Sequence, residues 1–326
     1  MLSIRENVLE TVRGGSPDRY VNQYEYLSMM MSPIGGGSRP RPGGEAKDGW
    51  GVTFSFPVGT PGPFPVHDDA HKVLKDVTMW QDVVKAPSTE APAEVWEAAE
   101  ARAAQIDRSQ TFATAFLAPG IFEQMHHLMG MEDALINYYE EPEAMQDLIN
   151  YITDYKIRNA EQIIKHLKPN AVFHHDDWGS HISSFLSPEM FREFFLEPYQ
   201  RFYGFLKANG VELIIHHNDA YSANLVPTMI DMGIDIWQGA TDTNDIPTLL
   251  QNYGGKLTIM GGLNNGKIDK PDWTPEDAAA EVERMCRACG TKHFIPCLTA
   301  GLPGSTFPGV YECVSENIDR MSKILF

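Results

Sequence analysis

VELIIHHND, residues 211–219, decides the fold class of this chain. This short run rich in β-branched residues follows Asn209-Gly210, a typical helix stop, and ends abruptly in polar side chains. Similar runs recur along the sequence, at residues 111–117, 171–175, 233–238, 256–260 and 291–297. The starts near 171, 211, 233 and 256 are 40, 22 and 23 residues apart, which is typical of βα units with parallel strands.

The segments between these runs carry helix start signals. Ser187-Pro188-Glu189 and Thr274-Pro275-Glu276 each combine a capping hydroxyl, a proline at the first helical position and an acid in the first turn. No GxGxxG motif or P-loop follows a predicted strand, so a doubly wound nucleotide-binding fold lacks its usual evidence. We therefore predict a single α/β domain over residues 1–326, a (β/α)₈ TIM barrel.

Residues 1–100 have a less regular pattern and are predicted to form an N-terminal extension. A short helix is expected at 4–12, and the Gly- and Pro-rich stretch 32–44 should be an exposed loop. That loop is either a plain surface excursion or a lid that helps a partner to dock. The alternating aromatic and small residues of 49–69 indicate a β-hairpin covering the barrel mouth.

Composition narrows the function classes. The 326 residues are 43% apolar and carry a net charge of −18, from 44 acidic and 26 basic residues. Such a chain repels phosphate backbones, so we expect no nucleic-acid partner. We expect no membrane association either, because the sequence has no apolar run of about 18 residues and no apolar leader. A cytoplasmic location is the default expectation, and a homodimer is left open.

All four cysteines, Cys286, Cys289, Cys297 and Cys313, lie in the last 41 residues. A disulfide scaffold would not crowd them at one end, so we interpret them as free thiols. Cys286 and Cys289, with His293 and Cys297, superficially resemble a zinc-knuckle spacing. However, residues 275–289 read as one amphipathic helix, which would place the first two as structural thiols at the bottom of the barrel.

Polar residues gather where the predicted strands end, and this is where barrel enzymes build their active sites. Strand 171–175 runs into His175-Asp176-Asp177-Trp178, and strand 211–217 runs into His217-Asn218-Asp219. The other ends supply Glu123, His127, Asn264 and Cys297.

His217 and Asp219 are two residues apart, so both side chains could face the barrel axis while His216 packs outward against a helix. An imidazole, a carboxylate and the Cys297 thiolate would be suitable Zn²⁺ ligands. The alternative is that His217 and Asp219 bond to each other and orient a loop, because His-x-Asp is a weak signal.

Asp176 and Asp177 form a paired carboxylate that could hold a cationic or NH-rich substrate or carry out acid/base work. We assign Asp177 and His175 as catalytic, and Asp176, Trp178, Asn264, His127 and Glu123 as substrate-binding. The alternative for Asp176 and Asp177 is structural support, with an aspartate capping a helix.

Several longer phrases resemble the uroporphyrinogen decarboxylase superfamily. They are LSPEMFREFFLEPYQRF (186–202), HHNDA (216–220), PTMIDMGIDIWQ (227–238), the tail from FIPCLTAGLPG (294–304), and the N-terminal RENVLETVRGGSPDR. The resemblance covers most of the chain and implies a (β/α)₈ barrel. True decarboxylases of this superfamily carry an arginine-rich RQAGRY-like motif that binds substrate carboxylates. This chain has VNQYEYL at residues 21–27, without either arginine, so porphyrinogen decarboxylation is not expected.

The other branch comprises corrinoid-dependent methyltransferases, which are zinc enzymes with a His-x-Cys motif and a second Cys about eighty residues later. His217, Asp219 and Cys297 stand at those positions here, 80 residues separating the first and last, with Asp219 replacing the first Cys. A carboxylate ligand would make the metal more Lewis acidic toward oxygen. This departure resembles enzymes that demethylate methoxylated aromatics onto a corrinoid protein.

The resemblance therefore implies a Zn²⁺-dependent O-demethylating methyltransferase, with cobalamin carried by a partner corrinoid protein and His175 or His127 as proton donor. Three alternatives stay open. One is methyl transfer from methylcobalamin to a thiol or folate, and another is a metal-free decarboxylase that holds its substrate with Asp176 and Asp177. The third is a non-catalytic binder that uses only the pocket.

Overall fold

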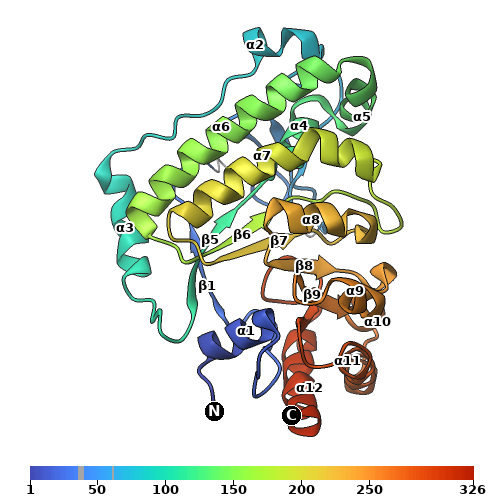
Figure 1. The fold of residues 1–326 in the computed structure, drawn as a ribbon. Coiled ribbons are helices and arrows are strands. Elements are labelled where there is room, and N and C mark those ends of the chain that lie inside the picture. The colour runs from blue at the N-terminus through green and yellow to red at the C-terminus, as the bar shows by residue number, and fades with distance from the viewer. Residues whose placement is uncertain (36–39, 61) are drawn as a thin grey trace.

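A parallel sheet of seven strands organises the computed structural model, which describes residues 1–35, 40–60 and 62–326. The order is β1-β5-β6-β7-β8-β9-β10, and the sheet curls as in a TIM barrel (Figure 1). The strand bounds are β1 Leu27–Met31, β5 Phe112–Leu117, β6 Ala171–His175, β7 Leu213–His217, β8 Ile236–Ala240, β9 Thr258–Leu263 and β10 Phe294–Leu298. The predicted α/β barrel class is confirmed, and all six predicted strands are present with bounds shifted by up to three residues.

The two faces of the curled sheet bury different side chains. Phe173, Ile215 and Cys297 belong to a cluster enclosed by the curl, together with Tyr24 and Tyr26. The alternate strand residues face the helices, because successive side chains on a strand point to opposite faces. This alternation determines which of two neighbouring residues at a strand end can reach the barrel mouth.

Seven strands are paired in the described residues rather than eight, and the two sheet edges meet through side chains. Gln23 has a φ of 51°, and the carbonyls of Asn22 and Tyr24 accept turn hydrogen bonds, so the chain before β1 turns instead of extending. The Leu298 backbone N–H of β10 donates to Gln23 Oε1 (3.3 Å), and the Tyr24 hydroxyl donates to the Ala300 carbonyl (2.6 Å).

Most of the helices cover the outer face of the sheet, whereas the first, residues 4–13, packs Val8 against the cluster inside the curl. The principal ones are α1 Ile4–Arg13, α3 Ala93–Ala103, α4 Ile121–Met129, α5 Met131–Glu140, α6 Pro142–Leu167, α7 Pro188–Ala208, α8 Val226–Met232, α9 Ile246–Tyr253, α11 Pro275–Cys289 and α12 Val310–Leu325; the shorter ones are α2 Trp80–Val83 and α10 Asn265–Ile268. Ser187 and Thr274 cap α7 and α11 through their side chains, as predicted. Proline occupies the first turn in both cases, where its missing N–H costs nothing.

The N-terminal extension adds a small antiparallel sheet of β2 Glu45–Lys47, β3 Thr53–Ser55 and β4 Phe64–Pro65. The predicted hairpin of 49–69 corresponds to β3 and β4. It packs beside α4, where the rings of Phe54 and His127 meet edge-on with centroids 5.5 Å apart. The predicted loop 32–44 includes residues 36–39, which lie outside the described residues.

Cys286 and Cys289 lie at the end of α11, as predicted, and the Tyr20 hydroxyl donates to the Cys286 carbonyl at 3.0 Å. Both thiols pack in the layer between helices and sheet. Within the described ranges, no helix is long and apolar enough to cross a membrane.

Candidate metal centre

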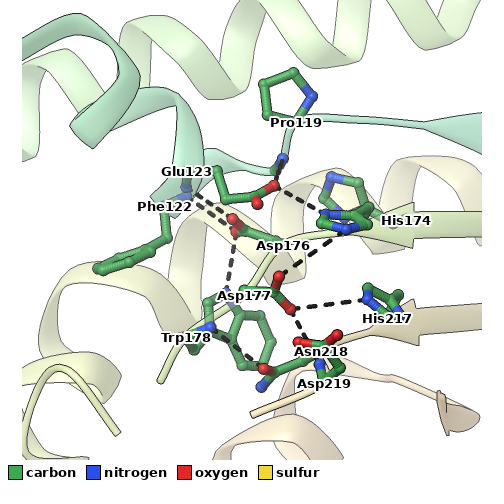
Figure 2. Close-up of polar contacts among 12 residues, drawn as sticks. Pro119, Phe122, Glu123, His174, Asp176, Asp177, Trp178, His217, Asn218 and Asp219 are labelled. Carbon is green, nitrogen blue, oxygen red and sulfur yellow. Dashed lines mark hydrogen bonds and ion pairs between the residues drawn. The ribbon is translucent and has the colours of Figure 1, made fainter. Parts of the chain in front are cut away.

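Two neighbouring parallel strands, β6 and β7, bring three ligand-type side chains together at their carboxyl ends. His175 and His217 are paired in register, and Asp177 follows β6 by two residues. One ligand atom from each of these three residues lies within 4.8 Å of the others. Asp177 stands between the rings, with Oδ2 4.0 Å from His175 Nε2 and Oδ1 3.9 Å from His217 Nε2. Figure 2 shows the Asp177 side chain directed toward His217. We call these three residues the strand-end cluster.

Gln238 of β8 orients His217. The Gln238 side-chain amide donates to the Leu298 carbonyl at 3.4 Å, so its Oε1 faces His217 and accepts from Nδ1–H. Nε2 of His217 then carries the free lone pair and points toward Asp177. Burial, reinforced by the neighbouring His175, lowers the pKa of His217 to about 4. The ring is therefore neutral at pH 7, the form that binds metals.

Glu123, at the start of α4, positions His175. Its Oε2 lies 3.1 Å from His175 Nδ1, and its side chain is only 12% exposed. Burial opposes a charge on the His175 ring, but the carboxylates of Glu123 and Asp177 outweigh it and raise the pKa of His175 to about 9. In the metal-free chain His175 is thus an imidazolium held between two carboxylates.

Asp219 lies at the rim of the cluster. Its backbone N–H donates to Asp177 Oδ1 at 3.0 Å, while its side chain is exposed. The surrounding protein and the charge of Asp177 raise the pKa of the Asp219 carboxyl to about 6. The sequence left open a hydrogen bond between the His217 and Asp219 side chains, and the described residues contain no such bond. Asp219 instead contacts Asp177 through its backbone N–H.

Asp176 has a different environment from Asp177. It is fully buried and accepts hydrogen bonds from the backbone of Phe122 (3.0 Å) and Glu123 (2.7 Å), from Trp178 Nε1 (3.0 Å) and from the Tyr199 hydroxyl. The first two donors belong to the first turn of α4, so Asp176 satisfies a helix N-terminus from a neighbouring strand. These contacts agree with the alternative prediction for Asp176, in which the aspartate supports the structure by capping a helix. Trp178 is also buried, with 1% exposure.

The remaining residues assigned to substrate binding are spread around the mouth. His127, half-buried on α4, contacts Phe54 of the small sheet, and burial holds its pKa well below the usual value. Asn264 caps α10 and donates to Asp242 Oδ2 at 2.6 Å, at the end of β9. Glu123, by contrast, contacts the strand-end cluster directly through His175.

Cys297 belongs to the buried cluster inside the curl and is fully buried. Burial raises the pKa of its thiol above the usual range, although hydrogen bonds with Tyr24 and Gln238 oppose the rise. Cys297 and His217 thus share Gln238 as a neighbour, but Cys297 and Asp219 are not members of the strand-end cluster. Their assignment as metal ligands stays a prediction.

Gln238, which contacts His217, was not predicted from the sequence as a site residue. It ends the predicted strand 233–238, and its inward position could have been derived from the period of two. A neutral amide does not stand out among ligand-type residues, so only its contact with His217 shows its role.

The donor set of the strand-end cluster fits a divalent metal ion. Two imidazole nitrogens and one carboxylate oxygen are a common set for catalytic Zn²⁺, which binds such atoms at about 2.0–2.2 Å. The amide behind His217 and the carboxylate behind His175 provide the outer contacts that fix ligand orientation. Oxygen and nitrogen ligands alone would make a harder site than one that contains Cys297.

Comparison with known proteins places the chain in a family. The solved structure of a methyltransferase from Methanosarcina mazei has a similar fold, with a TM-score of 0.69 and 11% identity over 98% of this chain and 99% of that chain. A B12-independent methionine synthase from Shewanella sp. W3-18-1 reaches a TM-score of 0.46 at 12% identity, over 74% and 69% of the two chains. No protein of curated function matches. The family model described as uroporphyrinogen decarboxylase (URO-D) matches residues 48–321, and the chain belongs to this family.

Proposed function

We propose that this protein is a metal-dependent methyltransferase that transfers a methyl group from a small methoxylated aromatic compound to a corrinoid carried by a partner protein. The observation that carries the proposal is the strand-end cluster of His175, Asp177 and His217, with a neutral Nε2 of His217 directed toward Asp177. The fold likeness to a solved methyltransferase supports the same choice within the family.

His175, Asp177 and His217 would hold the metal, and Glu123 and Gln238 would orient the two imidazoles. A bound Zn²⁺ would polarise the ether oxygen of the substrate and stabilise the negative charge that develops there. The bond between the methyl carbon and the oxygen would break with its electron pair left on the oxygen, which then takes up a proton, and the partner's corrinoid in its Co(I) form would supply the electron pair for the new bond to the methyl carbon. In this arrangement His175 is a ligand rather than the proton donor that the sequence suggested.

The segment 21–27 argues against the decarboxylase activity after which the family is named. Gln23 donates to Ser315 Oγ (2.8 Å) and the Tyr24 hydroxyl to the Ala300 carbonyl (2.6 Å), so these side chains link the N-terminal segment to the rest of the barrel. Neither supplies a cation for a substrate that carries several carboxylates. Asp176, the other candidate for holding a decarboxylation substrate, has its oxygens engaged by four donors.

Metal analysis combined with activity tests the proposal. Purified protein should bind about one equivalent of Zn²⁺, and His217→Ala should lose it. With zinc and an added corrinoid protein, the native enzyme should demethylate at least one member of a panel of methoxylated aromatics. Full turnover by metal-free protein would refute the metal role. Release of CO₂ from carboxylated substrates without methyl transfer would favour the decarboxylase alternative.

A further inference from the structure

A cavity lies outside the strand-end cluster. Its volume is about 280 Å³, and it is bounded by the ends of β1 and β5 and by side chains of α4, α6 and α7. His174 of β6 lines it, whereas its neighbour His175 belongs to the strand-end cluster. Successive residues of a strand point to opposite faces, so the His174 side chain lies at the cavity and the His175 side chain at the strand-end cluster.

The walls of this cavity carry deeply buried polar atoms that lack a hydrogen-bond partner among the described residues. They are Nε2 of Gln124, the hydroxyl of Tyr155 and Nε2 of His174, on side chains that are 1%, 4% and 0% exposed. Buried polar groups in native proteins are almost always paired. With Oδ1 of the half-buried Asn159, four such atoms lie on residues that line one cavity, and a molecule bound there could supply their missing partners.

A chain of hydrogen bonds determines which nitrogen of His174 carries the proton and which is an acceptor. His216 Nε2–H donates to the Asp176 carbonyl (3.1 Å), so Nδ1 of a neutral His216 ring accepts from the Tyr203 hydroxyl (2.7 Å). The Tyr203 oxygen then accepts from His174 Nδ1–H (2.8 Å). Nε2 of His174 is left as an acceptor, whereas Gln124 Nε2 is a donor.

The other walls limit the size and charge of the occupant. Trp50 and Phe116 contribute aromatic surface. Lys156 donates to the Pro119 carbonyl, and the carboxylates of Asp176 and Glu123 act on its charge. The one cationic side chain among the lining residues is therefore already compensated, and burying a further charge would be costly. A volume of about 280 Å³ lies just below the ~300–1,000 Å³ typical of pockets for drug-sized ligands.

We propose that this cavity is a binding site for a small, neutral, hydroxylated ring compound of the phenol type. A hydroxyl group both donates and accepts, so it can bond to His174 Nε2 and to the amide of Gln124, while its ring packs against the aromatic wall. The site goes beyond the proposed function, because it uses none of the residues of the strand-end cluster.

Calorimetric titration of the full-length, metal-free protein with phenol and resorcinol tests this site. The native protein should bind both saturably, and toluene and benzoate more weakly. The double variant Gln124→Met with Tyr155→Phe keeps the side-chain volumes but removes two hydrogen-bonding groups, so the Kd should rise about five- to hundredfold. Its melting temperature should not fall, because the groups removed are unpaired.

Two further variants test whether phenol binds in this cavity or elsewhere in the protein. Tyr151→Phe is the matched control, because its hydroxyl accepts from the Ala86 backbone outside the cavity; it should bind phenol as the native protein does. Asp177→Asn should also bind phenol normally, whatever its effect on metal binding and methyl transfer. Binding lost in Asp177→Asn but kept in the double variant would locate phenol at the strand-end cluster and overturn the inference. Absence of saturable binding by the native protein, or tighter binding of benzoate, would overturn it as well.

Discussion

Two adjacent aspartates should respond in opposite ways to the same substitution. Asp176 is fully buried and accepts four hydrogen bonds, whereas the Asp177 side chain is 29% exposed and lies between two histidines. We predict that Asp176→Asn destabilises the fold and leaves the metal ligands in place. Asp177→Asn should leave the fold intact and remove a metal ligand.

The magnitude for Asp176→Asn follows from its contacts. An asparagine that places its NH₂ at the Oδ1 position leaves the Glu123 backbone N–H unpaired, while the other oxygen keeps its three donors. Leaving one buried donor unsatisfied costs about 1–3 kcal/mol. The free energy of unfolding should therefore fall by about 1–3 kcal/mol.

Asp177→Asn should change the free energy of unfolding by less than about 1 kcal/mol, because an amide oxygen can still accept from the Asp219 N–H. Zinc affinity should fall at least tenfold, since the charged ligand is lost. Urea unfolding of the metal-free proteins and zinc competition with a chromophoric chelator measure the two quantities. Equal destabilisation by both substitutions, or zinc affinity lost only in Asp176→Asn, would refute the division of roles.

Four further predictions concern the cluster and the fold. Since the pKa of His175 is raised to about 9, zinc must displace a proton from its ring at pH 7. In chelator competition, zinc affinity should therefore rise about tenfold per pH unit up to about pH 9. A zinc affinity that does not change with pH would contradict this. In the metal-free protein the raised pKa of His175 adds to the free energy of unfolding, and this contribution is complete below pH 6.5 and lost as the pH rises through about 9. Urea unfolding as a function of pH measures it. His175→Gln should abolish this pH dependence. Gln238→Leu should weaken zinc binding about 10–100-fold, because it releases the His217 ring. Gln238→Glu keeps an acceptor for the ring and should retain zinc binding. Equal zinc affinities of these two variants would count against the orienting role of Gln238. Thr274→Ala should lower the free energy of unfolding by about 1 kcal/mol in urea and Thr274→Ser by much less, because the hydroxyl caps α11.

The order of helices and strands could be predicted from the sequence because its signals are local. β-Branched runs such as 213–217 and capping residues such as Ser187 act on their own segment of the chain, whatever its neighbours do. The gathering of polar residues at strand ends was also predictable, because parallel strands place all their carboxyl ends at one edge.

The sequence by itself determined the barrel class and the end of the barrel that carries the polar residues, and its period of two allowed an inward direction for His217. Only the tertiary structure decided which of these groups meet. Asp176 and Asp177 are chemically identical, but one lies under the first turn of α4 and the other between two histidines. Gln238 became visible only through its contact with His217. Such partners come from different strands and helices, so the distances between their side chains depend on how the sheet curls and how the helices pack. No local sequence pattern encodes these distances.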